Sequence, residues 1–162
     1  MDKPSVFILG AGSVGSGLAL ALQDCGYSIN GIWNRRETKN YHWLSDDFGF
    51  CVHTDLRAAT ALIQQSKIIF ICVTDDCIQD VTSSLCSNVE LAPETIITHL
   101  SGCLSSELID APNNCHKGSF HPLAACPNPI TTREVVRNTF IAIEGDSQAR
   151  SYLQAIATAL GS

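Results

Sequence analysis

The chain has 162 residues, which is about the size of one domain. Hydrophobic residues make up 45% and charged residues 16%, a globular composition that argues against disorder. The formal net charge of −6 argues against a general nucleic-acid binder, because neutralising phosphates requires a basic face. The sequence has no apolar run of about 18 residues and no secretory leader pattern at its start, so we expect neither a membrane span nor export.

Eight cysteines are scattered along the chain, and no two of them form a Cys-x-x-Cys pair. Small secreted scaffolds held by disulfides are shorter and richer in loops. We therefore expect reduced thiols and a cytoplasmic location. The cysteine spacing also does not match a zinc site, and no metal is expected.

Short apolar runs alternate with helical patterns along the chain. The predicted strands cover residues 5–10, 27–34, 50–53, 67–73, 95–100, 118–120 and 139–143. The predicted helices cover residues 13–25, 37–48, 56–65, 76–87, 104–109 and 147–160, whereas 124–133 is predicted to be a loop that contains Pro127 and Pro129. Asp55 is predicted to cap the third helix, and Asp75 or Asp76 the fourth. This order predicts an α/β protein, a single Rossmann domain over 1–162 with a doubly wound, mainly parallel sheet and helices on both faces.

A glycine motif follows the first predicted strand and opens the first predicted helix. Gly10, Gly12 and Gly15 fit the pattern G-x-G-x-x-G, which in this context indicates a dinucleotide site. Gly10 allows the tight turn, Gly12 lets the backbone approach a pyrophosphate, and Gly15 permits close packing of helix on strand. The helix N-terminus, with Ser13 and Val14, offers free N–H groups to the anion. The alternative is a glycine-rich turn that binds no ligand.

The end of the second predicted strand distinguishes between dinucleotides. Sites selective for NAD place an acidic residue there, whereas an arginine accommodates the 2′-phosphate of NADP. This chain has Asn34 followed by Arg35 and Arg36, and three of its ten basic residues lie within positions 35–39. Guanidinium groups bind phosphate in fork geometry, so we predict NADP(H) as the cofactor. A solvated turn with incidental charge is the alternative.

These motifs together resemble a known superfamily over nearly the whole chain. Residues 10–22 and 34–36 are similar to the NADP-binding Rossmann domains of the pyrroline-5-carboxylate reductase and 6-phosphogluconate dehydrogenase superfamily. Residues 73–76, 99–102, 119–123 and 143–146 resemble a narrower branch of oxidoreductases described as deazaflavin-dependent NADP reductase-like. The resemblance implies that Val73, Thr74 and Asp75 line the cofactor ribose and nicotinamide, although Asp75 as a simple helix cap is the alternative.

The resemblance also bears on chain organisation. Members of the superfamily usually continue into a helical C-terminal domain that forms the dimer and closes the active site. We expect that this chain lacks that domain, which leaves open whether it completes a reaction alone. A homodimer, formed through apolar surface left on the last helix near Leu160, is a further expectation.

The candidate substrate residues follow the fifth and sixth predicted strands, because ligands of doubly wound sheets bind at the carboxyl ends of the strands. His121 is our first candidate for proton transfer, since Pro122 holds it in an extended loop and imidazole titrates near neutral pH. The His-Pro pair also resembles a stretch of prephenate dehydrogenases in which the histidine faces the substrate. A histidine that only shapes the loop is the alternative.

The other candidates near this edge are weaker. Ser101 begins a small-residue turn that either admits a ligand or packs closely, and Ser119 is a candidate to hold a substrate carboxylate. His99 is expected to be structural. The three remaining histidines are expected to be surface residues without partners: His42, His53 and His116.

Three functions are consistent with the sequence. The first is an NADP(H)-dependent oxidoreductase, or its cofactor-binding domain, that moves hydride to or from a small carbonyl, imine or hydroxy acid. The second is a non-catalytic module that senses NADP(H), and the third is an S-adenosylmethionine-dependent methyltransferase with a similar glycine loop. The expected partner is a small-molecule substrate, with no nucleic acid and no membrane.

Overall fold

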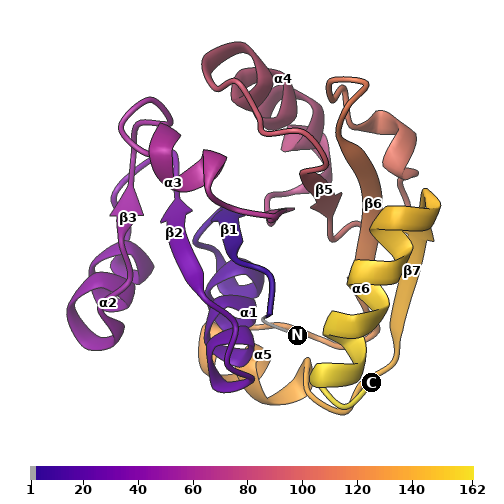
Figure 1. The fold of residues 1–162 in the computed structure, drawn as a ribbon. Helices are drawn as coiled ribbons and strands as arrows, with labels where there is room; N and C mark the ends of the chain where they lie inside the picture. The colour runs from indigo at the N-terminus through magenta and orange to yellow at the C-terminus, as the bar shows by residue number, and fades with distance from the viewer. Residues whose placement is uncertain (1–2) are drawn as a thin grey trace.

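The computed structural model describes residues 3–162 and contains one seven-stranded sheet (Figure 1). The strands are β1 (Val6–Leu9), β2 (Ile29–Trp33), β3 (Val52–His53), β4 (Ile68–Ile71), β5 (Ile96–His99), β6 (His116–Pro122) and β7 (Ile141–Gly145). Their order in the sheet is β3-β2-β1-β4-β5-β6-β7, and β7 is antiparallel to β6 whereas the other neighbours are parallel. The predicted doubly wound, mainly parallel Rossmann fold is confirmed.

Residues 3–162 contain six α-helices, of which the first five lie between strands and the last follows β7. They are α1 (Ser13–Asp24), α2 (Lys39–Phe48), α3 (Thr60–Gln64), α4 (Ile78–Asn88), α5 (Pro129–Val135) and α6 (Ser147–Ala159). Two 3-10 turns, η1 (Asp75–Cys77) and η2 (Ser106–Leu108), follow β4 and β5. Helices therefore cover both faces of the sheet, as expected for βαβ crossovers.

The sheet separates two apolar cores. Residues of α1, α2 and α6 pack on one face, where Phe70 and Phe120 meet edge to face with ring centroids 5.5 Å apart. Residues of α3 and α4 pack on the other face, against Phe7 and Ile69. Every residue of β4 is fully buried, which explains why its sequence is a continuous apolar run.

The strand order places a crevice at the carboxyl ends of β1 and β4. The chain runs from β1 outward to β3 and then crosses back to β4 on the other side of β1. In doubly wound sheets this switch point leaves a gap between the loops that follow the two strands, and ligands bind there. In this protein those loops carry the glycine motif and residues 72–75.

The prediction of a loop over residues 124–133 is wrong, because α5 begins at Pro129. Asn128 caps this helix through its Oδ1, which accepts the Thr131 amide at 2.9 Å. Proline fits the first helical turn, where its missing N–H would have no partner in any case. The helix packs beside α1 (Figure 1). Arg133 donates two hydrogen bonds of 2.7 Å to Asp24 of α1.

Several predicted boundaries and caps also differ. The third helix begins at Thr60 instead of residue 56, and Asp55 accepts the Arg57 amide at 2.9 Å in the turn before it, so Asp55 does not cap the helix. The predicted short helix over 104–109 is the 3-10 turn η2. Strand β6 is longer than predicted, and β7 is shifted by two residues, because pairing with residues 118–122 of β6 sets its bounds at 141–145.

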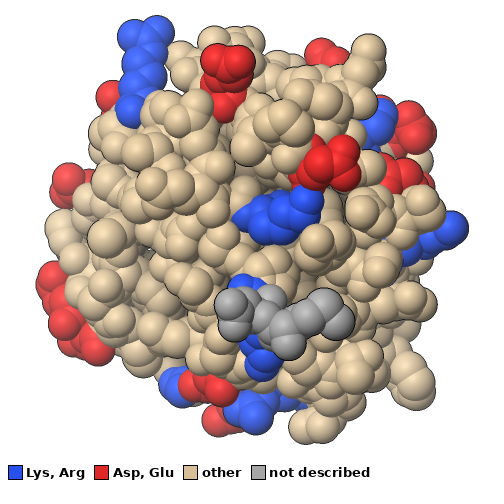
Figure 2. All heavy atoms as spheres, in the orientation of Figure 1, with Lys and Arg blue, Asp and Glu red and all other residues tan. Residues whose placement is uncertain are grey.

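The surface within residues 3–162 agrees with the composition. Both charge signs are spread over the face in Figure 2, without a large patch of one sign. None of the described helices is long and apolar enough to cross a membrane. All eight cysteines are free thiols. Leu160 is buried, and the homodimer stays a prediction.

Candidate cofactor and substrate site

The glycine loop has the shape that a pyrophosphate requires. A Cβ atom added at Gly12 would meet no atom within 4 Å, so the loop leaves open space in front of its backbone. Gly12 is also the N-cap of α1 and offers no side-chain cap, which leaves the first amides of the helix for an external anion. By contrast, Gly10 has a φ of +113° and Gly15 packs against the Gly10 carbonyl. The glycine loop therefore fits a pyrophosphate group.

Two asparagine side chains hold this loop against the end of β2. Asn34 accepts the Ala11 amide at 3.0 Å through its Oδ1 and donates to the Arg36 carbonyl at 2.6 Å. Asn40 donates to the Ala11 carbonyl at 3.0 Å. Asn34 was a predicted cofactor residue, whereas Asn40 was not, because nothing in the sequence indicates that a residue of α2 reaches back to the glycine loop.

The two predicted phosphate-binding arginines lie in the turn between β2 and α2. Arg35 and Arg36 are both exposed to solvent. The Arg35 guanidinium lies 3.5 Å from Cys77 Sγ, in the turn after β4, so it spans the mouth of the crevice from the β2 side. Trp33, the residue at the end of β2, donates from its Nε1 to the Thr54 carbonyl at 3.1 Å and holds the strand end in place.

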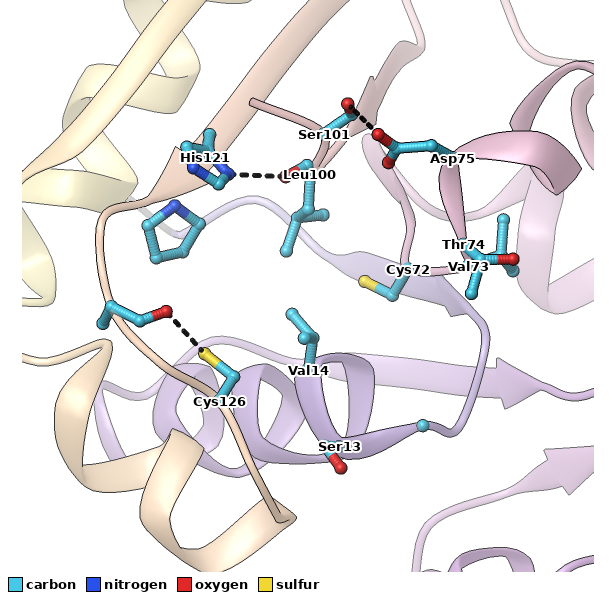
Figure 3. A pocket seen from close by; sticks show the side chains of 13 residues that line it. Ser13, Val14, Cys72, Val73, Thr74, Asp75, Leu100, Ser101, His121 and Cys126 are labelled. Atoms are coloured by element: carbon cyan, nitrogen blue, oxygen red, sulfur yellow. Dashed lines mark hydrogen bonds between the residues drawn. The ribbon is translucent and has the colours of Figure 1, made fainter. Parts of the chain in front are cut away.

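A cavity of about 330 Å³ opens between the glycine loop and the ends of β4, β5 and β6, and we call it the nucleotide cavity (Figure 3). Its walls are formed by residues 12–14, 72–75, 100–101, 121–122, 124 and 126. It brings together the predicted cofactor residues Ser13, Val14, Val73, Thr74 and Asp75. The same cavity contains the candidate substrate residues Ser101 and His121, so one continuous space joins the two predicted groups.

His121 is fixed by a bond and by a contact. Its Nδ1 lies 2.9 Å from the Leu100 carbonyl oxygen (Figure 3). Because a carbonyl only accepts, Nδ1 carries the hydrogen and Nε2 of the neutral ring has a free lone pair. A Cβ added at Gly102 would lie 2.6 Å from this Nε2, so the ring fits here only because residue 102 has no side chain. The small turn after β5 thus packs closely against the histidine.

Ser101 connects β5 to the turn after β4. Its Oγ donates to Asp75 at 2.8 Å and accepts the amides of Cys103 and Leu104, each at 3.2 Å (Figure 3). Asp75 therefore does not act as the side-chain cap of a helix, since the 3-10 turn η1 begins at this residue and Thr74 precedes it without a capping bond. Every hydrogen-bonding position of the Ser101 hydroxyl is already taken within the protein.

A second cavity of about 340 Å³ lies beside the first, and we call it the serine cavity. Ser101 and His121 line both cavities, whereas Ser119 and Glu144 line only the serine cavity. The buried Ser119 hydroxyl donates to the Ser101 carbonyl at 3.3 Å. Sequence analysis did not identify Glu144 as a functional residue, because only the antiparallel pairing of β7 with β6 brings it beside Ser119.

The remaining histidines divide into different environments. His99 is fully buried, and its Nδ1 accepts the Ser101 amide at 3.2 Å, which agrees with a structural role. His116 is not the partnerless surface residue that we expected, since its two ring nitrogens lie 3.1 Å from Glu94 and 3.2 Å from Asp146. His53 is half-buried with a shielded Nε2, whereas His42 is exposed near Glu37. Pairing across strands produced the His116 cluster, and sequence spacing does not reveal it.

Of the two cysteines that line the nucleotide cavity, Cys72 is not activated. Burial raises the pKa of the Cys72 thiol well above its ordinary value. Nucleophilic chemistry needs the thiolate, and burial of Cys72 disfavours that charged form. Cys72 therefore contributes apolar surface to the cavity.

The switch-point crevice and the open glycine loop define the class of protein, a dinucleotide-binding Rossmann domain. Residues 5–102 match the family described as NADP oxidoreductase, coenzyme F420-dependent. This match spans more than half of the chain, and the chain belongs to that family. It is an NAD(P)-binding domain of a dehydrogenase and reductase family, which does not agree with the methyltransferase alternative. A comparison with curated protein sequences gives no match.

Solved structures share the fold at low sequence identity. A Bacteroides fragilis protein assigned as an NADP oxidoreductase has a TM-score of 0.80 and 19% identity, over 98% of this chain and 58% of that one. Pyrroline-5-carboxylate reductase from Coxiella burnetii has a TM-score of 0.74 and 14% identity, over 98% and 57%. Pyrroline carboxylate reductase from Plasmodium falciparum, with NADP bound, has 0.66 and 14%, over 99% and 56%. The chain thus spans little more than half the length of these proteins.

Proposed function

We propose that this chain is the NADP(H)-binding part of an oxidoreductase that transfers hydride to or from a small substrate. The nucleotide cavity is the observation that carries the proposal, because it joins the open helix N-terminus of α1 to the imidazole of His121. Family membership supports a dinucleotide in this cavity. Position 34 is an asparagine and not an acidic residue, and Arg35 and Arg36 follow it. This pattern favours NADP(H) over NAD(H).

In this proposal each segment has a separate task in binding. The amides at Ser13 and Val14 would hold the pyrophosphate, and the two arginines would hold the 2′-phosphate. Val73 and Thr74 would line the ribose and nicotinamide at the end of β4. Asp75, held by the Ser101 hydroxyl, would keep the turn after β4 in register with the turn after β5.

His121 would exchange the proton that accompanies hydride transfer. A bound nicotinamide supplies or accepts the hydride, and the substrate heteroatom gains or loses a proton. The Leu100 carbonyl holds the Nδ1 hydrogen, so Nε2 is the ring nitrogen that is available for this exchange. Ser101 acts as a positioning residue, since its hydroxyl is committed to Asp75 and to two amides.

Calorimetric titration of the purified chain with NADPH and NADH tests the cofactor assignment. We expect NADPH to bind at least about tenfold more tightly, since charged bidentate bonds to a phosphate contribute roughly 1.5–3 kcal/mol each. Arg35→Ala and Arg36→Ala should weaken NADPH binding and leave NADH binding nearly unchanged. Arg150→Ala is the matched control, because Arg150 is an exposed arginine on α6 that lines neither the glycine loop nor the nucleotide cavity. Equal affinities for the two cofactors would contradict the assignment.

Hydride transfer is tested separately by the oxidation of NADPH with a panel of small carbonyl and imine compounds. His121→Asn should lower kcat by about 10²- to 10⁴-fold, the usual contribution of a general acid or base, with little change in NADPH affinity. NADPH binding without turnover on any substrate would instead support the non-catalytic module.

A further inference from the structure

The described side chains that line the two cavities include negatively charged groups but no lysine or arginine. Asp75 lines the nucleotide cavity and Glu144 the serine cavity. Glu144 is held in place by Ser106, whose amide and hydroxyl donate to its two carboxylate oxygens at 2.8 and 2.9 Å. Both carboxylates are hydrogen-bonded to uncharged groups only, so neither negative charge is neutralised by a partner.

The nearby cations do not change this balance. Lys117 lies on the same side of β6 as Ser119 and His121, but its Nζ is paired with Glu107 at 2.9 Å. Arg35, whose guanidinium contacts Cys77 in the turn after β4, lines neither cavity. A substrate carboxylate placed beside His121 would therefore face two carboxylates without a cation to receive it.

We infer that the substrate is an imine, or in the reverse direction the corresponding amine, that carries no carboxylate. This inference rests on the proposed function and specifies its substrate class. A positively charged nitrogen would be attracted by Asp75 and Glu144, and its N–H groups could donate to their free lone pairs. The expectation from sequence that Ser119 receives a substrate carboxylate is not part of this inference, because the Ser119 hydroxyl donates to the Ser101 carbonyl.

In the proposed reduction, the imine gains one proton and one hydride. In its imidazolium form, with Nδ1–H still held by the Leu100 carbonyl, His121 would donate the Nε2 proton to the imine nitrogen, which becomes an iminium ion. The iminium carbon then takes up one hydrogen with two electrons as hydride from the reduced nicotinamide, and the C=N π pair becomes the nitrogen lone pair. The imine is reduced to the amine, NADPH is oxidised to NADP⁺, and the neutral His121 ring regains a proton from water.

Binding of a matched pair of product analogues tests the inference without any turnover. Piperidine and pipecolate share one ring and one basic nitrogen, and pipecolate adds a carboxylate. We expect NMR titration to give a dissociation constant for piperidine at least about tenfold below that of pipecolate. The titration is performed with and without NADP⁺, and NADPH affinity is measured independently, so a failure of cofactor binding is distinguished from a failure of this inference.

Two variants change the charge of the serine cavity in opposite directions. Glu144→Gln should reduce the preference for piperidine, and Ala142→Lys, at an exposed position of β7 that lines the same cavity, should increase the affinity for pipecolate. Thermal unfolding establishes that each variant is folded. If Glu144→Gln does not fold, Ala142→Lys still tests the inference. Pipecolate that binds as tightly as piperidine, or no binding of piperidine, would overturn the inference.

Discussion

Gly12 and Gly15 stand three residues apart in one turn, but an added methyl group meets opposite surroundings at the two positions. At Gly15 it would lie 1.9 Å from the Gly10 carbonyl oxygen, whereas at Gly12 it would meet no atom within 4 Å. The space at Gly15 is already filled by the protein, and the space at Gly12 is left for a ligand. The two glycines therefore serve packing and binding separately.

Substitution of these glycines should separate stability from binding. Gly15→Ala should lower the free energy of unfolding by about 1–3 kcal/mol or more through overpacking. Gly12→Ala should change it by no more than about 1 kcal/mol, the size of a capping effect, while weakening NADPH binding at least about tenfold. Urea unfolding and calorimetric titration measure the two quantities. The separation fails if Gly12→Ala binds NADPH as well as the unmodified protein does.

Gly102 and His121 form a second close contact of this kind. Gly102→Ala should displace the imidazole, lower stability by about 1–3 kcal/mol and reduce turnover as His121→Asn does, because the new methyl group would lie 2.6 Å from Nε2. In a His121→Ala background the ring is absent, so Gly102→Ala should then cost little. A double-mutant cycle by urea unfolding measures this coupling. An unchanged penalty in that background would show that the two residues do not interact.

At the scale of elements, the packing of α5 on α1 holds the segment that closes the nucleotide cavity. Gly17 of α1 allows this approach, because a Cβ there would lie 2.4 Å from Thr132 of α5. Ser13 donates from its Oγ to the Pro127 carbonyl at 3.2 Å, just before α5 begins. Arg133 of α5 and Arg137, which follows the end of α5, both reach Asp24 at the end of α1, at 2.7 and 3.6 Å. The cavity wall formed by residues 124 and 126 is thus anchored at its C-terminal end.

This anchor should make stability depend on acid pH. The Arg133 hydrogen bonds lower the pKa of Asp24 from 3.8, against an opposing effect of burial and with help from the charges of Arg133 and Arg137. A pKa that is lower in the folded state adds stability above the unfolded pKa, which is lost as pH falls through the folded value. The free energy of unfolding, measured with urea, should decrease from pH 5 to pH 2. This decrease should be smaller in Asp24→Asn by up to about 1 kcal/mol, because the pair is partly exposed.

Asp146 contributes to the same acid range and is the comparison for Asp24. Burial raises the pKa of Asp146, but hydrogen bonds from the Ala149 and Lys117 amides and the neighbouring His116 outweigh it and lower the pKa overall. Asp24→Asn should therefore leave part of the pH dependence in place. A pH profile identical to that of the unmodified protein would contradict a role for the Asp24 pair.

For the whole molecule, the cofactor should act as a stabilising ligand because its site is built from segments far apart in the sequence. At a hundred times its dissociation constant, a ligand that binds only the folded state adds about 2.7 kcal/mol. For a chain of this length that corresponds to a rise in Tm of roughly 5–11 °C. Differential scanning fluorimetry with NADPH and NADH at equal concentration should show the larger shift with NADPH. A larger shift with NADH would contradict the predicted preference.

The sequence predicted the fold well where local patterns control structure. The apolar run over 67–73 and the glycine motif at residues 10–15 each specify backbone form through near neighbours, and both predictions agree with the structure. The error over residues 124–133 arose because Asn128-Pro129 is typical both of a turn and of a helix start. Packing on α1, which the local sequence does not reveal, adds to the Asn128 cap in favour of the helix.

The candidate site divides along the same line. The sequence by itself determined the dinucleotide loop, the basic turn at residues 35–36 and the candidacy of His121, because each depends on residue type and on neighbours in the chain. Only the tertiary structure brought Gly102 against His121, placed Glu144 beside Ser119 and put His116 between two carboxylates. Those contacts depend on strand order and on the antiparallel pairing of β7, which arise from burial of apolar surface over the whole sheet and leave no local mark in the sequence.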